Sequence, residues 1–161
     1  MIVIVMGVVG AGKTTVGKLL ASQLGWEFAD ADDFHPQSNV DKIRHGIALT
    51  DEDREPWLDR LREAIARWIA AGKSVVLACS ALKRAYRAKL LPRPQVRFVY
   101  LKGSAALIAD RLRSRHGHFA GESILASQLA DLEEPEKAIT VDISDTPEQI
   151  VAEIKRALAM E

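Results

Sequence analysis

A glycine-rich stretch near the N-terminus carries the first residues whose types and spacing could do chemistry. Residues 7–14 have the sequence GVVGAGKT and fit the phosphate-binding pattern G-x-x-x-x-G-K-[ST]. Glycines let such a loop curl so that backbone N–H groups face phosphate oxygens, and a following helix adds partial positive charge. In this pattern Lys13 reaches the β- and γ-phosphates, and the hydroxyl of Thr14 ligates Mg²⁺. We therefore expect ATP and Mg²⁺ here. The candidate phosphate-binding residues are Gly7, Gly10, Ala11, Gly12, Lys13, Thr14 and Thr15.

The flanks of this stretch have the order that a phosphate-binding loop requires. Residues 2–6 are all apolar and indicate a buried strand, and apolar residues recur at helical spacing over residues 16–24. A glycine-rich turn without a ligand is the alternative, and these flanks make it the weaker interpretation. The order of strand, loop and helix predicts a P-loop.

Two carboxylates follow the second expected strand, residues 26–29. Asp30 and Asp32 stand where the carboxyl ends of parallel strands form a ligand crevice. A carboxylate there can accept the proton of an attacking hydroxyl or hold Mg²⁺ through water. The alternative is that both residues only cap and solvate a loop. The third expected strand, residues 74–79, is followed by Ser80 rather than an acid, which argues against a motor or transporter ATPase.

A second group of candidates is a pair of arginines next to a polar segment. Arg111 and Arg115 are four positions apart and so share a helix face, and the segment after them contains glycines and His118. Such a segment could fold over ATP, supply cations for the transferred phosphoryl group and exclude water. We therefore expect a lid at about residues 111–124. Arginines on a solvated surface are the alternative interpretation.

The acceptor of the phosphoryl group should meet cations that follow the second and third strands. An anionic acceptor, such as a carboxylate, would explain their number. Alternatively, residues 83–97 form a basic patch that touches nucleic acid, but Tyr86 is the only aromatic residue interleaved with its first basic residues. The cations in question are Lys42, Arg54, Lys83, Arg84 and Arg87.

Composition bounds these interpretations. The chain has 161 residues, which suits a single domain over residues 1–161, and its 22 basic and 22 acidic residues cancel. The net charge of the chain therefore provides no overall electrostatic attraction to nucleic acid or to a membrane surface. The only cysteine, Cys79, suits a reducing cytosol, and the apolar run at residues 2–6 is too short for a signal peptide or a membrane span. We expect a cytoplasmic protein with neither nucleic acid nor membrane as partner.

The order of apolar patterns predicts the fold class. Short apolar runs alternate with helical patterns along the chain, which indicates a parallel sheet with helices on both faces. The expected fold is a three-layer α/β/α P-loop NTPase fold. Its five expected strands are residues 2–6, 26–29, 74–79, 96–101 and 138–143, and its helices include residues 38–45, 58–69 and 81–91.

Several blocks outside the P-loop carry a more specific signal. They include residues 30–36 (DADDFHP), 51–58 (DEDREPWL), 79–84 (CSALKR), 98–103 (FVYLKG) and 132–135 (LEEP), together with residues 117–119 and 127–128. These blocks run from the first strand to the last and closely resemble the gluconate kinase (gluconokinase) family. The resemblance implies ATP-dependent phosphorylation of the C6 hydroxyl of D-gluconate to 6-phospho-D-gluconate, a fold similar to shikimate and nucleoside monophosphate kinases, and a homodimer.

The resemblance also implies roles for single residues. Lys13, Asp32, Arg111 and Arg115 would be catalytic, with Asp32 as the base. Thr14 would ligate the metal ion. The substrate-binding residues would be Asp32, His35, Lys42, Arg54, Lys83 and His118. This chain departs from many members by having Val9 and Ala11 where serines are common and Ala31 where glycine is frequent.

Two other function classes stay open from sequence. One is another small-molecule kinase, acting on shikimate or a nucleoside monophosphate, which would share the loop, the acid and the lid. The other is a nucleotide-dependent switch or binding module, which is weakened because the N-K-x-D segment of guanine-reading switches is absent.

Overall fold

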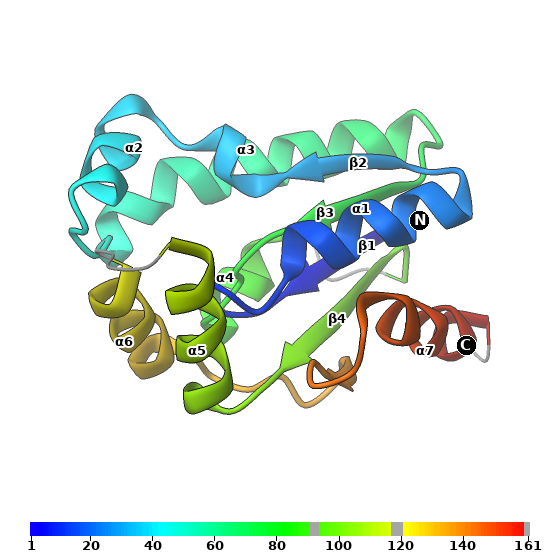
Figure 1. The fold of residues 1–161 in the computed structure, drawn as a ribbon. Coiled ribbons are helices and arrows are strands. Elements are labelled where there is room, and N and C mark those ends of the chain that lie inside the picture. The colour runs from blue at the N-terminus through cyan, green and yellow to red at the C-terminus, as the bar shows by residue number, and fades with distance from the viewer. Residues whose placement is uncertain (91–93, 117–120, 160–161) are drawn as a thin grey trace.

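A five-stranded parallel sheet forms the centre of the protein, as the sequence predicts (Figure 1). The computed structural model describes residues 1–90, 94–116 and 121–159. The strand order is β2-β3-β1-β4-β5, and every pairing is parallel. The strands are β1 (Ile2–Met6), β2 (Glu27–Asp30), β3 (Val75–Ala78), β4 (Val96–Lys102) and β5 (Ile139–Asp142).

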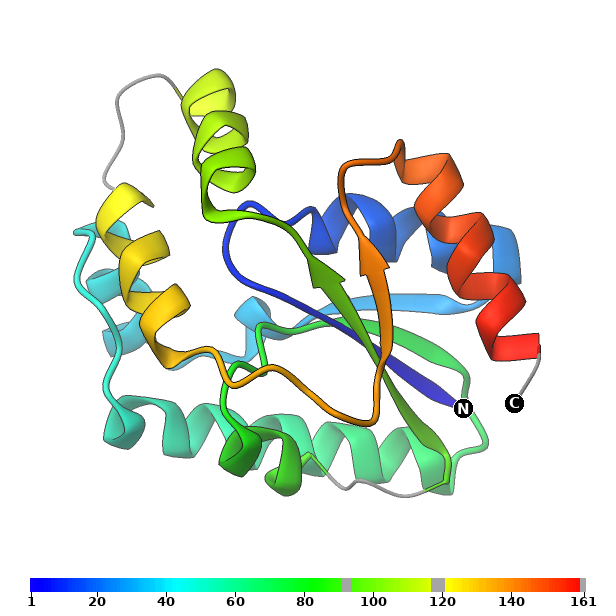
Figure 2. The same ribbon diagram turned by 90° about the horizontal axis from the view of Figure 1, so that it is seen from below.

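Helices cover both faces of this sheet, so the three-layer prediction is confirmed. Figure 2 shows α1 (blue) and α7 (red) on one side of the sheet and α3 and α4 (teal and green) on the other. Helices α2, α5 and α6 lie beyond the carboxyl ends of the strands (Figure 1). The helices are α1 (Lys13–Leu24), α2 (Gln37–Arg44), α3 (Asp51–Ala70), α4 (Arg84–Lys89), α5 (Ala105–His116), α6 (Gly121–Asp131) and α7 (Pro147–Ala159), and η1 (Ala31–Phe34) is a short 3₁₀ helix.

The central strand β1 explains the layering. All five of its residues are fully buried, as expected for a parallel strand with helices on both faces. Val3 and Val5 pack into the core on the side of α1 and α7, whereas Ile2, Ile4 and Met6 pack into the core on the side of α3. The alternation of a strand therefore divides one apolar run between two cores.

The helix expected at residues 81–91 is shorter than predicted and begins at Arg84. Ala81 has a φ of 44°, and Lys83 is extended with φ −97° and ψ 146°, so neither residue can belong to a helix. The guanidinium of Arg87 holds this turn by donating to the carbonyls of Ala81 (2.7 Å) and Leu82 (3.0 Å). The turn after β3 thus places Ser80 at the carboxyl edge of the sheet.

Helix α3 begins with a capping box. The hydroxyl of Thr50 accepts from the N–H of Asp53 (3.1 Å), and the carboxylate of Asp53 accepts from the N–H of Thr50 (2.9 Å). Further along, the indole N–H of Trp57 donates to the carbonyl of Ala31 (2.7 Å). These contacts fix the start of α3 against η1. Among the described residues, no helix is long and apolar enough to cross a membrane.

Thr50→Ala tests the contribution of this cap. The substitution removes the acceptor for the N–H of Asp53, and loss of an N-cap costs about 1 kcal/mol, which lowers Tm by roughly 2–4 °C for a chain of this size. Thermal unfolding followed by circular dichroism measures the shift. Thr50→Ser keeps the hydroxyl and should have the Tm of the wild type. An unchanged Tm in Thr50→Ala would contradict the assignment of Thr50 as the N-cap.

Candidate active site

The loop between β1 and α1 has the curled backbone that phosphate binding requires. Gly10 and Gly12 have φ values of 83° and 96°, in the left-handed region that favours glycine. A Cβ at Gly10 would also lie 2.7 Å from Cγ of Leu112 on α5. Gly12 caps α1, whose first turn contains no acidic residue. The free N–H groups at the start of α1 therefore form an anion site.

Lys13 folds back over this loop. Its ammonium group donates to the carbonyls of Gly7 (2.9 Å) and Val8 (3.0 Å). Desolvation lowers the pKa of Lys13, while the charges of Asp32 and Asp30 and the thiol of Cys79 act against that shift. Lys13 lines one cavity together with these two carboxylates, which lie at the carboxyl end of β2 and just beyond it.

Those carboxylates come from β2 and η1. The Oδ2 of Asp30 lies 3.5 Å from the hydroxyl oxygen of Thr14, and its Oδ1 accepts from the N–H of Asp32 (2.9 Å). Desolvation by the surrounding chain raises the pKa of Asp32, the neighbouring Asp30 carboxylate adds to this, and Lys13 acts against it. Asp30 therefore caps η1 and faces Thr14, which leaves the carboxylate of Asp32 available to a ligand.

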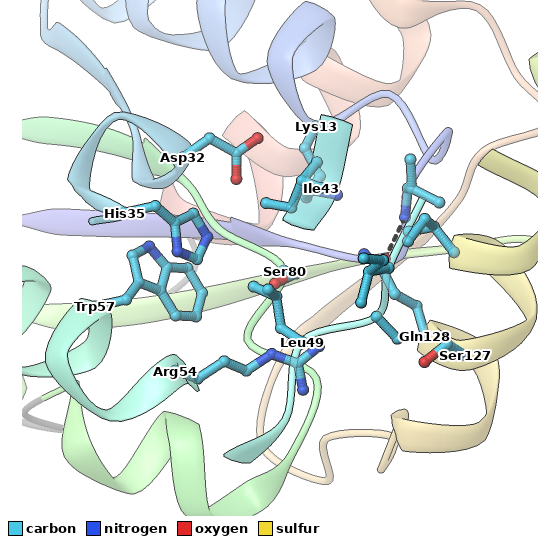
Figure 3. Close-up of a pocket in the computed structure, with 14 residues that line it drawn as sticks. Lys13, Asp32, His35, Ile43, Leu49, Arg54, Trp57, Ser80, Ser127 and Gln128 are labelled. Atoms are coloured by element: carbon cyan, nitrogen blue, oxygen red, sulfur yellow. Dashed lines mark hydrogen bonds between the residues drawn. The ribbon is translucent and has the colours of Figure 1, made fainter. Parts of the chain in front are cut away.

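Two adjoining cavities meet at these residues. The first, here called the loop cavity, is lined by the P-loop, Thr14, Asp30 and the end of β3. The second, called the His35 cavity, is lined by His35, Arg54 and Trp57 and by residues of α2 and α6 (Figure 3). Both cavities are lined by Val9, Lys13, Asp32 and Ser80. A group bound at the phosphate loop would thus contact a group bound in the His35 cavity beside Asp32.

A third cavity lies on the other side of the loop and is here called the Arg111 cavity. It is lined by Arg111 and Ser114 of α5, by Asp145, and by Gly10, Gly12 and Thr15, which also line the loop cavity. The guanidinium of Arg111 donates a hydrogen bond to the carbonyl of Ile143 after β5. Three cavities therefore follow one another across the carboxyl edge of the sheet.

Arg54 is a charged residue in the wall of the His35 cavity, away from the part shared with the loop cavity, and its side chain is held from two sides. One guanidinium nitrogen donates to the hydroxyl of Tyr86 (2.8 Å) and to Asp131 of α6 (3.1 Å). Only 8% of its side chain is exposed, so the charge is presented to the cavity rather than to bulk solvent. Tyr86 in turn donates to Asp51. The cation is therefore fixed in place before any ligand binds.

Three neutral residues around the same cavity were not among the residues singled out from sequence. Trp57 is 2% exposed and stacks on His35 with ring centroids 4.5 Å apart. The buried side chain of Asn39 lies 3.2 Å from Nδ1 of His35. Gln128 accepts from the N–H of Val9 in the P-loop (2.7 Å). All three fall within or beside the blocks that resemble gluconokinases, which is the signal that could have found them.

The structure places the five cations expected at the acceptor in different surroundings. Of the five, Arg54 lines the His35 cavity. Lys42 pairs with Asp53 (2.8 Å), and Lys83 pairs with Asp51 (2.9 Å). Arg84 lies at the start of α4, and Arg87 is buried where it holds the turn after β3. Arg54 is paired as well, with Asp131, but it lines the cavity and Lys42 and Lys83 do not. The substrate-binding roles of Lys42 and Lys83 stay predictions.

The expected lid is only partly described. Arg111 lines the third cavity rather than the walls that the first two share, so its catalytic role stays a prediction. Arg115 lies in the last turn of α5, but its side chain is outside the described residues, as is all of His118.

Comparison with known proteins decides the family. A family model described as shikimate kinase matches residues 9–159. The chain is 45% identical to the gluconokinase of Gluconobacter oxydans, over 95% of this chain and 88% of that protein. It is 44% identical to a probable gluconokinase of Xenopus tropicalis, with 96% and 92% covered. The chain belongs to the gluconokinase family. This membership makes it a kinase, that is, a transferase that binds a nucleotide.

The same comparison supports the fold of this gluconokinase-family chain. The crystal structure of a gluconokinase from Sinorhizobium meliloti is 41% identical to it and superposes with a TM-score of 0.87, covering 98% of this chain and 91% of the other. Both the family resemblance and the P-loop α/β fold predicted from sequence are therefore confirmed.

Proposed function

We propose that this chain is a gluconokinase, which transfers the γ-phosphoryl group of ATP to the C6 hydroxyl of D-gluconate and releases 6-phospho-D-gluconate and ADP. The observation that carries the proposal is the meeting of the loop cavity and the His35 cavity at Lys13 and Asp32. The relatives named gluconokinase, at 44–45% identity over nearly the full chain, supply the identity of the acceptor.

The His35 cavity suits one orientation of a sugar acid. Arg54 offers a fixed guanidinium for a carboxylate, which is the group that a planar cation binds best. Asp32 lines the part of the wall shared with the phosphate loop. A gluconate with its carboxylate at Arg54 would therefore present its far hydroxyl to Asp32, beside the phosphate site.

In this arrangement the reaction is a direct in-line transfer. The oxygen of the C6 hydroxyl forms a bond to the γ-phosphorus, the bond from that phosphorus to the β–γ bridging oxygen breaks, and ADP leaves. Asp32 orients the hydroxyl and accepts its proton, and Lys13 neutralises charge on the phosphoryl oxygens. Proximity of the two substrates supplies much of the rate enhancement.

Magnesium is part of the proposal, and Thr14 with Asp30 would hold it. Mg²⁺ usually takes one or two protein oxygens and completes its shell with water and substrate phosphates. The 3.5 Å between the Thr14 hydroxyl and Asp30 puts two suitable oxygens at the loop cavity, and the described residues contain no cluster of three or more acidic, His or Cys ligands. This donor set fits an ion carried with ATP. It would supply charge neutralisation of the phosphates.

The remaining assignments extend the same proposal. The nucleoside part of ATP would occupy the Arg111 cavity, and residues 111–124 would act as a lid of a single domain spanning residues 1–161. The resemblance implies a homodimer, and the composition and charge balance favour a cytoplasmic protein with no nucleic acid or membrane partner. The buried free thiol of Cys79 suits a reducing compartment.

The direct test is ADP release by the purified protein with Mg-ATP and a panel of acceptors. We expect turnover with D-gluconate and only background hydrolysis with shikimate, glucose, nucleoside monophosphates or no acceptor. Turnover with another acceptor would reassign the substrate and keep the kinase mechanism. ATP binding without turnover on any acceptor would contradict the proposal.

Asp32→Asn tests the proposed base. The amide cannot take the proton, so kcat should fall roughly 10²- to 10⁴-fold while the affinity for ATP, measured by calorimetry, changes little. Asp33→Asn, at the exposed neighbouring position of η1, is the matched control and should keep near wild-type kcat. Wild-type kcat in Asp32→Asn would remove Asp32 from this role.

Arg54→Met tests carboxylate recognition. Loss of a charge-assisted hydrogen bond should raise the KM for gluconate roughly 10- to 100-fold and leave the KM for ATP within about two-fold. Arg62→Met, which removes an exposed cation from the same helix, is the control. Thermal unfolding of both variants separates this effect from loss of structure. An unchanged gluconate KM in folded Arg54→Met would place the carboxylate elsewhere.

A further inference from the structure

One ring nitrogen of His35 contacts a side chain of the protein, and the other is available to a ligand. Its ring lies flat on Trp57, with an interplanar angle of 12°, and lines the cavity proposed for the acceptor (Figure 3). Nδ1 lies 3.2 Å from the side-chain amide nitrogen of Asn39. Among the described residues, no hydrogen bond reaches Nε2. The stacking fixes the plane of the ring and the contact with Asn39 fixes which of its edges carries Nδ1, so together they fix the direction in which Nε2 points.

The orientation of the Asn39 amide is forced by a second contact. The same nitrogen donates to the backbone carbonyl of Asp53 at 2.7 Å. A carbonyl oxygen can only accept a hydrogen bond, so the NH₂ end of the Asn39 amide must face the carbonyl of Asp53. The amide oxygen in that position would be repelled by the carbonyl oxygen. Asn39 belongs to α2, is 2% exposed and bonds the start of α3 with its side chain, which leaves little room for the amide to turn. Its second hydrogen is therefore directed at Nδ1 of His35.

From these contacts we infer that Asn39 is a positioning residue that holds His35 as the neutral Nε2–H tautomer, so that His35 offers a fixed hydrogen-bond donor to an oxygen of the acceptor. An Nδ1 that accepts from Asn39 cannot carry a proton, so a neutral ring must carry its proton on Nε2. The inference rests on the proposed function for the identity of the acceptor, but the tautomer itself does not depend on it.

The charges around His35 favour the neutral ring. Partial burial, followed by the positive charge of Arg54, lowers the pKa of His35 to about 4, although Asp30 acts against them. Lys13 and Asp32 also line the same cavity. At neutral pH the ring therefore acts as a donor without a net charge, which suits a hydroxyl oxygen of a polyhydroxy acid. Arg54 supplies the charge for the carboxylate.

The tautomer can be measured on the intact protein without substrate. Nitrogen-15 NMR through long-range couplings to the ring protons separates protonated from unprotonated ring nitrogens, and His35→Gln identifies the His35 signals among the four histidines. We expect a protonated Nε2 and an unprotonated Nδ1 at neutral pH. A protonated Nδ1, or two protonated nitrogens, would overturn the inference whatever the acceptor proves to be.

A pair of substitutions tests the donor itself. The amide nitrogen of Gln reaches about as far as Nε2, whereas that of Asn reaches only as far as Nδ1. His35→Asn should therefore raise the KM for the acceptor about ten-fold or more, and His35→Gln should recover most of that loss, with the KM for ATP unchanged in both. Equal acceptor KM values in the two folded variants would show that His35 only supports the wall.

Asn39→Asp tests the positioning role. A carboxylate accepts, so the proton should move to Nδ1 of His35 and Nε2 should lose its donor. The NMR pattern should reverse and the acceptor KM should rise as in His35→Asn. A folded Asn39→Asp protein that keeps the wild-type tautomer would overturn the role of Asn39. A carboxylate beside the carbonyl of Asp53 could prevent folding. In that case the wild-type spectrum and the two His35 variants still test the tautomer and the donor role of His35.

Discussion

Backbone N–H groups can hold phosphates only where the chain curls tightly and no side chain fills the curl. In this protein the constraint falls on Gly10 and Gly12, whose φ values of 83° and 96° other residues rarely adopt. At Gly10 a side chain would also collide with Leu112, so the loop and α5 can pack together only if that position stays glycine. The curl places the start of α1, with Lys13 and Thr14, above the carboxyl end of β1. Every other part of the candidate site is placed relative to this edge.

The strand order determines what surrounds the loop. Because β3 lies between β1 and β2, the turn after β3 brings Ser80 between the loop and the carboxylates that follow β2. On the other side, β4 and β5 lead to Arg111 and Asp145, which line the third cavity. A parallel sheet with β1 at its centre therefore has two crevices at one edge, separated by the phosphate loop. In the proposed function, this division would let two substrates bind on opposite sides of one phosphoryl group.

The sequence predicted the architecture well because the apolar patterns are local. β1 and β3 are short apolar runs, and β1 is buried on both faces, so its pattern could not be mistaken for surface. The positions of the cations were harder to predict, because a sequence does not show which acidic side chain pairs with which basic one. Lys42 and Lys83 pair with Asp53 and Asp51 in the first turn of α3. Arg54, the residue after Asp53, pairs with Asp131 of α6 and also lines the cavity. The predicted helix covered residues 58–69, whereas α3 begins at Asp51, so the turn that carries these acids was not predicted. The side chains that they meet come from α2 and from the turn before α4.

Pre-organisation of the site by neighbouring groups of the protein was beyond prediction from composition or spacing. In the His35 cavity several polar side chains have one group bound to the protein before any ligand arrives: Arg54 by Tyr86 and Asp131, His35 by Asn39, and Gln128 by Val9. Side chains held in this way lose little further freedom on binding, so more of their interaction energy is available to position the substrate. Asp131 and Gln128 both belong to α6. One helix therefore contacts the cation at one end of the cavity and the phosphate loop at the other, so its position constrains both sites together.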